Sequence, residues 1–293
     1  MANLKEIRNR IVSISSTMQI TSAMKMVSAA KLRKAQNAVT QIRPYTSKLK
    51  EILSNLTANL DGSEGTFSTQ REVKNVLIVS VTSNRGLCGG FNNNVIKTVK
   101  RLISEEYKGC HTTVLSIGKK SNDAFKNTEW GIKGTFLPRD TENIWDELTF
   151  ETSSEIAQTL MEQFADLHQD KIVLVYNQFK NAAVQEIITE QFLPVLPPEN
   201  NEGDSSSVDY IFEPNKEFIL EELIPKSLKT QFFKALLDSQ ASEHGARMTA
   251  MHKATDNAKE LQDDLKLVYN KARQAAITNE ILEIVAGAEA LDG

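Results

Sequence analysis

The residues that come closest to a catalytic or phosphate-binding arrangement lie in the stretch SNRGLCGGFN, residues 83–92. This stretch combines three glycines with Arg85 and Cys88, and it follows the apolar run VKNVLIVSVT, which predicts a buried β-strand. A strand followed by a glycine-rich turn and a helix is how many proteins hold a phosphate group. A cysteine beside an arginine and a helix N-terminus is a setting in which a thiol becomes nucleophilic.

The spacing within residues 83–92 fits neither phosphate-binding template. A P-loop needs Lys and then Ser or Thr after its last glycine, whereas phenylalanine and asparagine follow Gly90. The three glycines also do not follow the G-x-G-x-x-G pattern of dinucleotide-binding turns. No histidine lies near Cys88 in the sequence to act as its base. We therefore expect a tight turn with unusual glycine conformations, Cys88 packed as a small apolar side chain, no catalytic residue and no direct nucleotide binding.

The composition is that of a soluble globular protein without a metal or cofactor. The 293 residues are 40% hydrophobic and 25% charged, and no apolar run approaches the roughly 20 residues of a membrane span. Two cysteines are too few for a disulfide framework, and the four histidines show no metal-ligand spacing with them. We expect no metal site and no cofactor.

Charge is unevenly distributed along the chain. The first 50 residues contain ten Lys or Arg and one acidic residue, Glu6, for a net charge of +9, whereas residues 51–226 carry −11. A basic arm on an acidic body indicates an acidic partner, which leaves nucleic acid, an anionic membrane and an acidic protein surface as candidates.

The two ends of the chain predict long helices. Residues 1–60 contain no glycine and one proline, Pro44, and residues 215–293 contain Pro225 near the start and Gly245 further along. Apolar residues recur at spacings of three and four in the first segment, at Leu4, Ile7, Ile11, Ile14, Met18, Ala35, Val39, Ile42, Leu49, Leu53, Leu56 and Leu60. The second segment predicts a heptad seam through Leu261, Leu265, Val268, Ala272, Ala275, Asn279, Leu282 and Ala286.

The middle of the chain, residues 61–214, predicts an α/β domain. Strand patterns alternate with helical patterns, which indicates an open, mostly parallel sheet of Rossmann-like type. The predicted strands cover residues 73–82, 112–117, 132–137, 171–176 and 186–195, and the predicted helices 91–107 and 143–168. Residues 200–207, NNEGDSSS, predict a polar loop.

Three domains follow from this pattern: residues 1–60, 61–214 and 215–293. We expect the two terminal helices to pair as a long antiparallel coiled coil that projects from the central α/β domain. A domain inserted between two paired helices is tolerable because the entropy of closing a loop grows only slowly with its length.

The basic stretch TSAMKMVSAAKLRKAQ, residues 21–36, allows more than one interpretation. One interpretation is a helix face exposed to solvent, but such a face normally mixes acidic and basic residues, and this stretch contains no acidic residue. Docking against an acidic protein surface is a second interpretation. DNA binding fits the charge, but no recognised nucleic-acid-binding fold accompanies it. The methionines suit either a changing contact surface or ordinary core packing.

Four motifs in order resemble the γ subunit of the F-type ATP synthase, in its bacterial form, over nearly the whole chain. They are TSAMKMVSAAKLRKAQ, SNRGLCGGFN, VDYIFEP at residues 208–214, and the C-terminal run from ASEHGARMTAMHKATDNA to LVYNKARQAAITNEILEIVAGAEAL. The resemblance implies a non-catalytic rotor shaft that transmits torque between a membrane c-ring and the catalytic β subunits during ATP synthesis and hydrolysis.

The resemblance also implies partners and contact residues. The partners would be α and β subunits in a 3:3:1 complex, the ε subunit, the c-ring and, indirectly, the δ subunit, with no nucleic acid. Positions matching the family's contacts with α and β loops are Met24, Lys25, Lys31, Arg33, Lys34, Gln240, Arg247, Gln274, Thr278 and Glu283. Tyr210 matches the contact with the c-ring.

The expected location is the cytoplasmic face of a bacterial inner membrane, as a peripheral protein. Residues 1–10 show neither an apolar signal core nor a transit peptide, which favours a bacterial chain over a mitochondrial precursor. The alternative function is a stand-alone coiled-coil adaptor that binds polyanions through its basic N-terminal helix.

Overall fold

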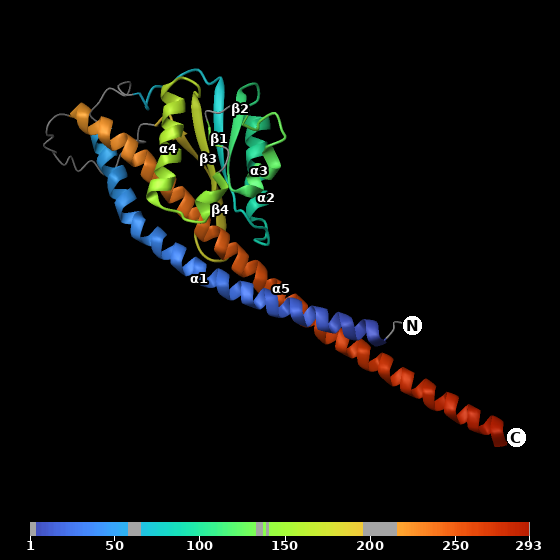
Figure 1. Cartoon of the computed structure of the whole chain (residues 1–293). Coiled ribbons are helices and arrows are strands. Elements are labelled where there is room, and N and C mark those ends of the chain that lie inside the picture. The colour runs from blue at the N-terminus through green and yellow to red at the C-terminus, as the bar shows by residue number, and fades with distance from the viewer. Residues whose placement is uncertain (1–3, 58–65, 133–136, 139–140, 196–215, 293) are drawn as a thin grey trace. The chain divides into compact units, whose positions relative to one another are not determined.

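The computed structural model describes residues 4–57, 66–132, 137–138, 141–195 and 216–292 (Figure 1). Its elements are, in chain order, α1 Leu4–Thr57, β1 Asn75–Val81, α2 Phe91–Arg101, the π-helical turn η1 Leu102–Glu106, β2 His111–Ile117, α3 Lys119–Phe125, the 3₁₀ turn η2 Thr141–Trp145, α4 Phe150–Ala165, β3 Lys171–Phe179, β4 Gln185–Leu193 and α5 Lys216–Asp292. The chain forms two compact units, which we call the α/β unit (Ala29–Ala246) and the helical unit (Met1–Ser28 with Arg247–Gly293). Each long helix contributes to both.

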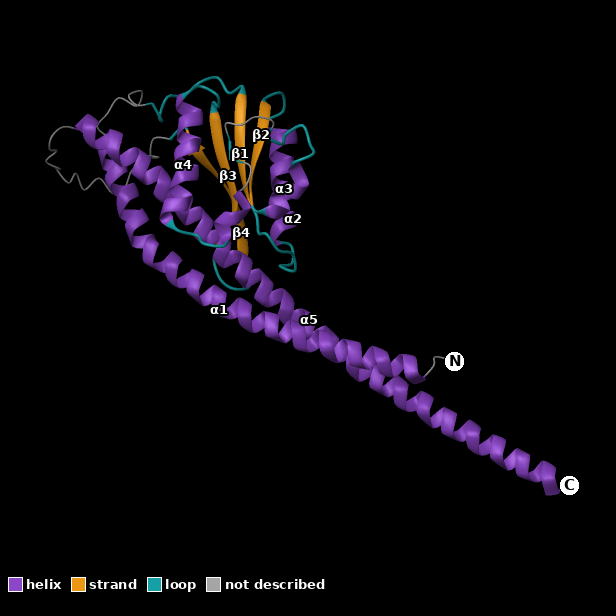
Figure 2. Ribbon diagram, viewed as in Figure 1, coloured by secondary structure: helices purple, strands orange, loops and turns teal. Residues whose placement is uncertain are grey.

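The sheet of the α/β unit has four strands in the order β2-β1-β3-β4 (Figure 2). Strand β1 pairs in parallel with β2 and with β3, so that Val79 lies opposite Leu115 on one side and Leu174 on the other. Strand β4 pairs antiparallel with β3 as a hairpin. Six of the seven residues of β1 are buried, as expected for a central parallel strand covered on both faces. The predicted open, mostly parallel sheet is confirmed.

Helices cover both faces of the sheet. On one face, α2 and η1 pack against the sheet through apolar side chains that include Val95, Val99 and Leu102. On the other face, α4 packs beside the first part of α5. Four side chains of α5 are buried in the same core cluster as the inward side chains of β1 and β3, namely Leu228, Phe232, Ala235 and Leu236. Helix α5 is therefore a structural layer of the α/β unit as well as a terminal helix.

Two elements of the α/β unit differ from the sequence prediction. The helix predicted over residues 143–168 is interrupted: η2 comes first, and α4 begins only at Phe150. The reason is a capping box, in which the Thr149 hydroxyl accepts a hydrogen bond from the backbone N–H of Thr152 and starts a new helix there. Of the strand predicted over 132–137, residues 133–136 lie outside the described residues, as do the polar loop at 200–207 and the domain boundaries near 60 and 214.

The apolar stripe predicted for α1 is confirmed from Leu4 to Leu49, whereas the side chains predicted at Leu53, Leu56 and Leu60 lie outside the described ones. Buried and half-buried positions of this helix repeat at spacings of three and four, through Leu4, Ile7, Ile11, Ile14, Met18, Thr21, Lys25, Ser28, Leu32, Ala35, Val39, Ile42, Thr46 and Leu49. Pro44 lies within the helix, between two stripe positions. The stripe becomes polar in its middle, at Thr21, Lys25 and Ser28, which the apolar pattern alone did not include.

The seam predicted on α5 was wrong in its phase. Leu261, Val268 and Leu282 are 51%, 49% and 61% exposed. The less exposed stripe shares only Leu265 and Ala272 with the prediction and runs through Met251, Thr255, Ala258, Gln262, Leu265, Tyr269, Ala272 and Ala276. Both the predicted seam and this neighbouring stripe satisfy a spacing of three and four residues. The covered stripe is the more polar of the two.

Two side-chain contacts give the direction of the helix pair. In the helical unit, the Thr255 hydroxyl of α5 donates to the Thr21 hydroxyl of α1 at 2.8 Å. In the α/β unit, Arg43 of α1 lies 4.0 Å from Asp238 of α5. Residue numbers rise along α1 while they fall along α5, so the helices run antiparallel, as predicted.

Polar positions within the covered stripes restrict how the two helices can pair. The stripe of α1 includes Thr21, Lys25 and Ser28, and the stripe of α5 includes Thr255 and Gln262. Such a pair is less stable than an all-apolar seam but accepts fewer alternative registers, because its hydroxyl and amide groups need partners.

Gly245 of α5 permits a close approach of the β3–β4 turn. A Cβ atom at this position would lie 3.2 Å from the carbonyl oxygen and 3.3 Å from the Cα of Ala182. These distances are tighter than ordinary van der Waals contact, and the neighbour is backbone, which shifts only with its whole turn. The glycine is thus explained by packing, which compensates for its low helix propensity.

We expect Gly245→Val to lower the free energy of unfolding by about 1–3 kcal/mol, because the branched side chain overlaps the Ala182 backbone. Urea unfolding of the full chain, followed by circular dichroism, measures this change. Gly287→Val is the matched control, since a Cβ at Gly287 meets nothing within 4 Å on the same helix. Equal effects of the two substitutions would contradict the packing explanation.

Candidate functional site: the exposed faces of the long helices

The glycine-rich turn at residues 83–92 is a structural connection between β1 and α2. Gly89 has a positive φ of 60°, and the non-glycine residue Leu87 has one of 63°. Gly90 has an ordinary helical conformation and forms the N-cap of α2. The expectation of glycines in unusual conformations is confirmed for Gly89 and wrong for Gly86 and Gly90, because the second left-handed residue of the turn is Leu87.

Cys88 is a packing residue, as predicted. Its side chain is 2% exposed and clusters with Phe91 and with Ala246 of α5. The Asn92 amide donates to its Sγ at 3.2 Å and also accepts from the backbone N–H of Ser83 at 2.9 Å, which closes the turn. An amide, a hydroxyl and a carbonyl group contact the thiol, and none of these three groups is a general base.

Helix α5 contacts the sheet near the place where doubly wound sheets bind ligands. In such sheets the ligand lies beyond the carboxyl ends of the strands, where the strand order reverses, which in this sheet is between β1 and β3. Near these strand ends, Cys88 and Phe91 pack on Ala246, and the Ser242 hydroxyl donates to the Asn177 carbonyl of β3 at 3.1 Å. Side chains of α5 therefore pack near the ends of β1 and β3, where sheets of this kind bind ligands.

The residues of α1 predicted as partner contacts divide into two groups. Lys31, Arg33 and Lys34 are exposed on α1, where a partner can reach their charges. Met24 and Lys25 are half-buried, and Lys25 lies on the covered stripe of the helix. The structure therefore does not place these five residues on one continuous exposed face.

The predicted contact residues on α5 also differ in accessibility. Gln240 is half-buried and Arg247 is only 8% exposed, so little of the Arg247 side chain is left for a partner in this conformation. Gln274, Thr278 and Glu283 are exposed, and the Thr278 hydroxyl donates to the Gln274 carbonyl one turn earlier. Tyr210 lies outside the described residues.

A set of exposed apolar side chains on both long helices was not predicted as a site. From Ile277 to Ala288 every position of α5 is exposed. The large apolar side chains exposed on the two helices include Val12, Ile20, Met26, Val27, Leu261, Leu267, Val268, Ile277, Ile281, Leu282, Ile284 and Val285. We call this set the exposed apolar residues of the long helices. The sequence signal was present, because such residues off the covered stripe mark a second face that needs a partner.

A family model described as ATP synthase matches residues 3–291 of the chain. The chain is 63% identical over 294 aligned residues to the ATP synthase gamma chain of Flavobacterium johnsoniae, and 60% identical to that of Christiangramia forsetii. Each comparison covers 100% of both chains. This chain belongs to the ATP synthase gamma-chain family. The resemblance carried by the four sequence motifs is thereby confirmed.

Solved structures of ATP synthases have the same fold as this family member. A chain of the Euglena gracilis mitochondrial ATP synthase superposes with a TM-score of 0.64 at 21% identity, covering 98% of this chain and 94% of that one. A second structure of the rotor of that enzyme gives a TM-score of 0.60 at 20% identity, covering 94% and 98%. The fold class predicted from the sequence is confirmed.

Within the described residues of this family member, no helix is long and apolar enough to cross a membrane. The same residues contain no group of three or more His, Cys, Asp or Glu side chains arranged to hold a metal ion.

We expect a thiol reagent to modify Cys110 in the folded chain and Cys88 only after unfolding. Cys110 is half-buried, whereas Cys88 is enclosed by Phe91, Ala246 and the turn. Mass spectrometry of the labelled chain, with and without denaturant, distinguishes the two sites. Rapid modification of Cys88 in the native chain would contradict its role as a packing residue.

Proposed function

We propose that this chain is the central rotor shaft of an F-type ATP synthase. It carries torque between a membrane c-ring and three catalytic β subunits, which stand with three α subunits around the long helices. The chain itself is non-catalytic and binds no nucleotide. It works at the cytoplasmic face of a bacterial inner membrane with the ε subunit beside it and the δ subunit further away.

The observation that carries the proposal is the set of exposed apolar residues of the long helices. Leaving a large apolar side chain in water instead of burying it costs about 1.5–3 kcal/mol. Ile277, Ile281 and Ile284 lie on a stretch of α5 that no described residue covers. A helix end enclosed by a ring of partner subunits explains this exposure, and full-length similarity to ATP synthase gamma chains supports α and β subunits as that ring.

Charge on α1 supports the same proposal. A shaft must release each contact as it turns, and exposed ion pairs suit this because each contributes only about 0.2–1 kcal/mol. Lys31, Arg33 and Lys34 offer such contacts to acidic loops of the β subunits. The other proposed contacts are Met24, Lys25, Gln240, Arg247, Gln274, Thr278 and Glu283 with α and β subunits, and Tyr210 with the c-ring.

The competing function, a stand-alone adaptor for polyanions, rests on the +9 charge of the first 50 residues alone. It explains neither the exposed apolar residues nor the family membership over the full chain. Salt-sensitive binding to DNA or anionic vesicles, in a chain that does not assemble with α and β subunits, would favour the adaptor.

We expect the double substitution Lys31→Glu and Lys34→Glu to reduce coupling more than assembly. Reversing two charges turns attraction to acidic loops into repulsion. At about 0.2–1 kcal/mol per contact, two contacts amount to roughly 0.4–2 kcal/mol, so the ions pumped per ATP hydrolysed should fall roughly two- to thirtyfold. Membrane vesicles containing the assembled complex report both rates. Lys97→Glu with Lys100→Glu is the matched control, since these lysines have the same spacing and are likewise exposed, on α2. An equal loss in the control would contradict the proposed contact.

We expect a disulfide between a cysteine at position 274 and one in a facing β-subunit loop to stop coupled ATP hydrolysis. Gln274 is exposed near the uncovered end of α5, and a covalent bond there prevents rotation within the ring. Activity should return on reduction. The control carries Gln274→Cys without the β-subunit cysteine. Full coupled activity with the bond intact would refute the rotor shaft.

A further inference from the structure

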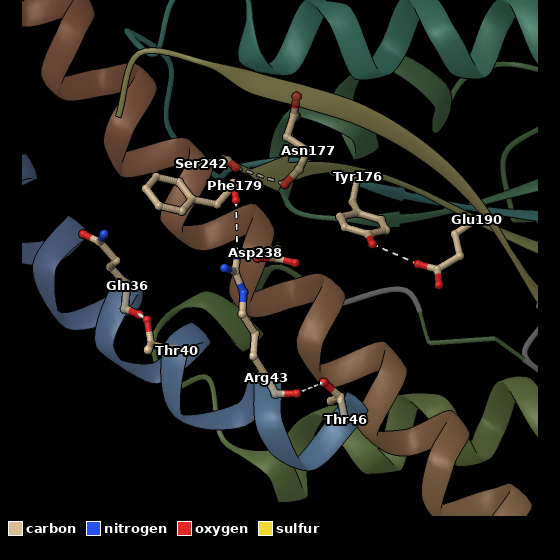
Figure 3. A network of polar contacts seen from close by, with 10 residues as sticks. All are labelled: Gln36, Thr40, Arg43, Thr46, Tyr176, Asn177, Phe179, Glu190, Asp238 and Ser242. Atoms are coloured by element: carbon tan, nitrogen blue, oxygen red, sulfur yellow. Dashed lines mark hydrogen bonds and ion pairs between the residues drawn. The ribbon is translucent and has the colours of Figure 1, made fainter. Parts of the chain in front are cut away.

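Arg43, Asp238 and the carbonyl of Phe179 join three elements of the α/β unit at one point. The Arg43 guanidinium comes from α1, Asp238 from α5, and Phe179 ends β3. The Arg43 Nη2 donates to the Phe179 carbonyl oxygen at 3.3 Å and lies 4.0 Å from Asp238 Oδ1. Figure 3 shows the arginine reaching from α1 to both groups. We call these three groups the polar clasp.

Asp238 is an unusual residue to find at this position. Its side chain is 1% exposed, and neither carboxylate oxygen accepts a hydrogen bond of ordinary geometry from the described residues. A buried carboxylate without such bonds is costly, so Asp238 is not explained by packing alone. The Arg43 side chain, by contrast, is 53% exposed, and it loses part of its hydration where it contacts Asp238 and the Phe179 carbonyl.

Further hydrogen bonds attach α5 to the sheet. Ser242 donates to the Asn177 carbonyl of β3, and Gln231 donates to Glu190 of β4 at 2.8 Å. Glu190 also accepts from the Tyr176 hydroxyl of β3 at 2.9 Å, and burial together with this carboxylate raises the pKa of Tyr176, so the hydroxyl stays protonated (Figure 3). These bonds hold α5 but do not involve α1.

We propose that Arg43 and Asp238 are positioning residues for torque transmission. Their ion pair, as part of the polar clasp, ties both long helices to the end of β3. The proposal rests on the rotor function above, because a clasp of this kind matters only if force passes from the α/β unit into the helices. Neighbouring helices that carry torque must not slide past each other. A charged pair with one buried partner resists sliding, since separation leaves the buried charge uncompensated.

The protonation of Asp238 adds a testable signature. Burial raises its pKa to about 6; the positive charges of Lys234 and Arg43 oppose this rise, and the negative charge of Glu190 assists it. Because the folded pKa lies above the ordinary value of 3.8, the contribution of this group to stability is greatest below that value and is lost as pH rises through about 6. Tyr176, which shares the network through Glu190, keeps its proton throughout that range because its pKa is raised. The ion pair between Arg43 and Asp238 therefore forms only as pH rises above about 6.

A double-mutant cycle on the full chain tests the clasp directly. It compares wild type, Arg43→Met, Asp238→Asn and the double variant by urea unfolding at pH 8 and at pH 5. We expect a coupling between the two substitutions at pH 8 that disappears at pH 5. Asp238→Asn by itself should raise the urea midpoint at pH 8, since it removes a buried charge and keeps the shape. Lys48→Met, which removes a cation from the same helix near Glu51, should show no coupling with Asp238→Asn.

The assembled complex in vesicles then tests the role in torque. We expect Arg43→Met and Asp238→Asn each to pump at least twofold fewer ions per ATP hydrolysed than wild type at pH 8. The control Lys48→Met should pump as many ions as wild type. Asp238→Asn is decisive, because a merely structural role predicts that a stabilised chain pumps at least as well as wild type. If Arg43→Met does not fold, Arg43→Lys is measured in its place. Because Arg43→Lys keeps the positive charge, we expect it to pump as many ions per ATP hydrolysed as wild type.

Each outcome has a distinct meaning. A cycle without coupling at pH 8 overturns the clasp, whatever the complex does. Coupling in the cycle with unchanged pumping in Asp238→Asn overturns its role in torque. A wild-type complex that assembles but shows no ion pumping contradicts the proposed rotor function instead, while the cycle on the chain still decides whether the clasp exists.

Discussion

The burial of one face of α5 against the sheet is the interaction on which the rest of the structure depends. Leu228, Phe232 and Leu236 join the same core cluster as the side chains of β1 and β3. Fully burying a Leu or Phe side chain stabilises by about 1.5–3 kcal/mol, so these side chains anchor the helix firmly. Because α5 continues without interruption to Asp292, the helix that completes the α/β core also forms part of the helical unit.

That arrangement also places α5 at one edge of the sheet. A doubly wound sheet offers a ligand crevice where the strand order reverses, and here Ala246 and Ser242 of α5 lie near the carboxyl ends of β1 and β3. Helix α5 thus packs against the edge of the sheet at which doubly wound sheets bind ligands. The glycine-rich turn consequently serves packing, because Cys88 and Phe91 cluster with Ala246 of α5.

Much of this organisation was determined by the sequence. Long three-four repeats predicted both terminal helices, and β-branched runs predicted the four strands that pair in the sheet. The glycine spacing at residues 83–92 excluded a phosphate loop, and the composition of the same turn marked Cys88 as a packing residue. These features are local: a helix repeat, a strand run or a turn depends on residues that are close together in the chain, so the pattern of residue types contains the information.

Only the tertiary structure decided which of two stripes on α5 is covered, because both satisfy the three-four repeat and the choice depends on the side chains that α1 presents. It likewise decided the role of Gly245, which is unfavourable within a helix until the Ala182 backbone is seen to approach it. Arg43 and Asp238 are far apart in the sequence and meet because folding brings α1, α5 and the end of β3 together. The raised pKa of Asp238 follows from burial, and burial is a property of the assembled core that no local pattern of residues contains.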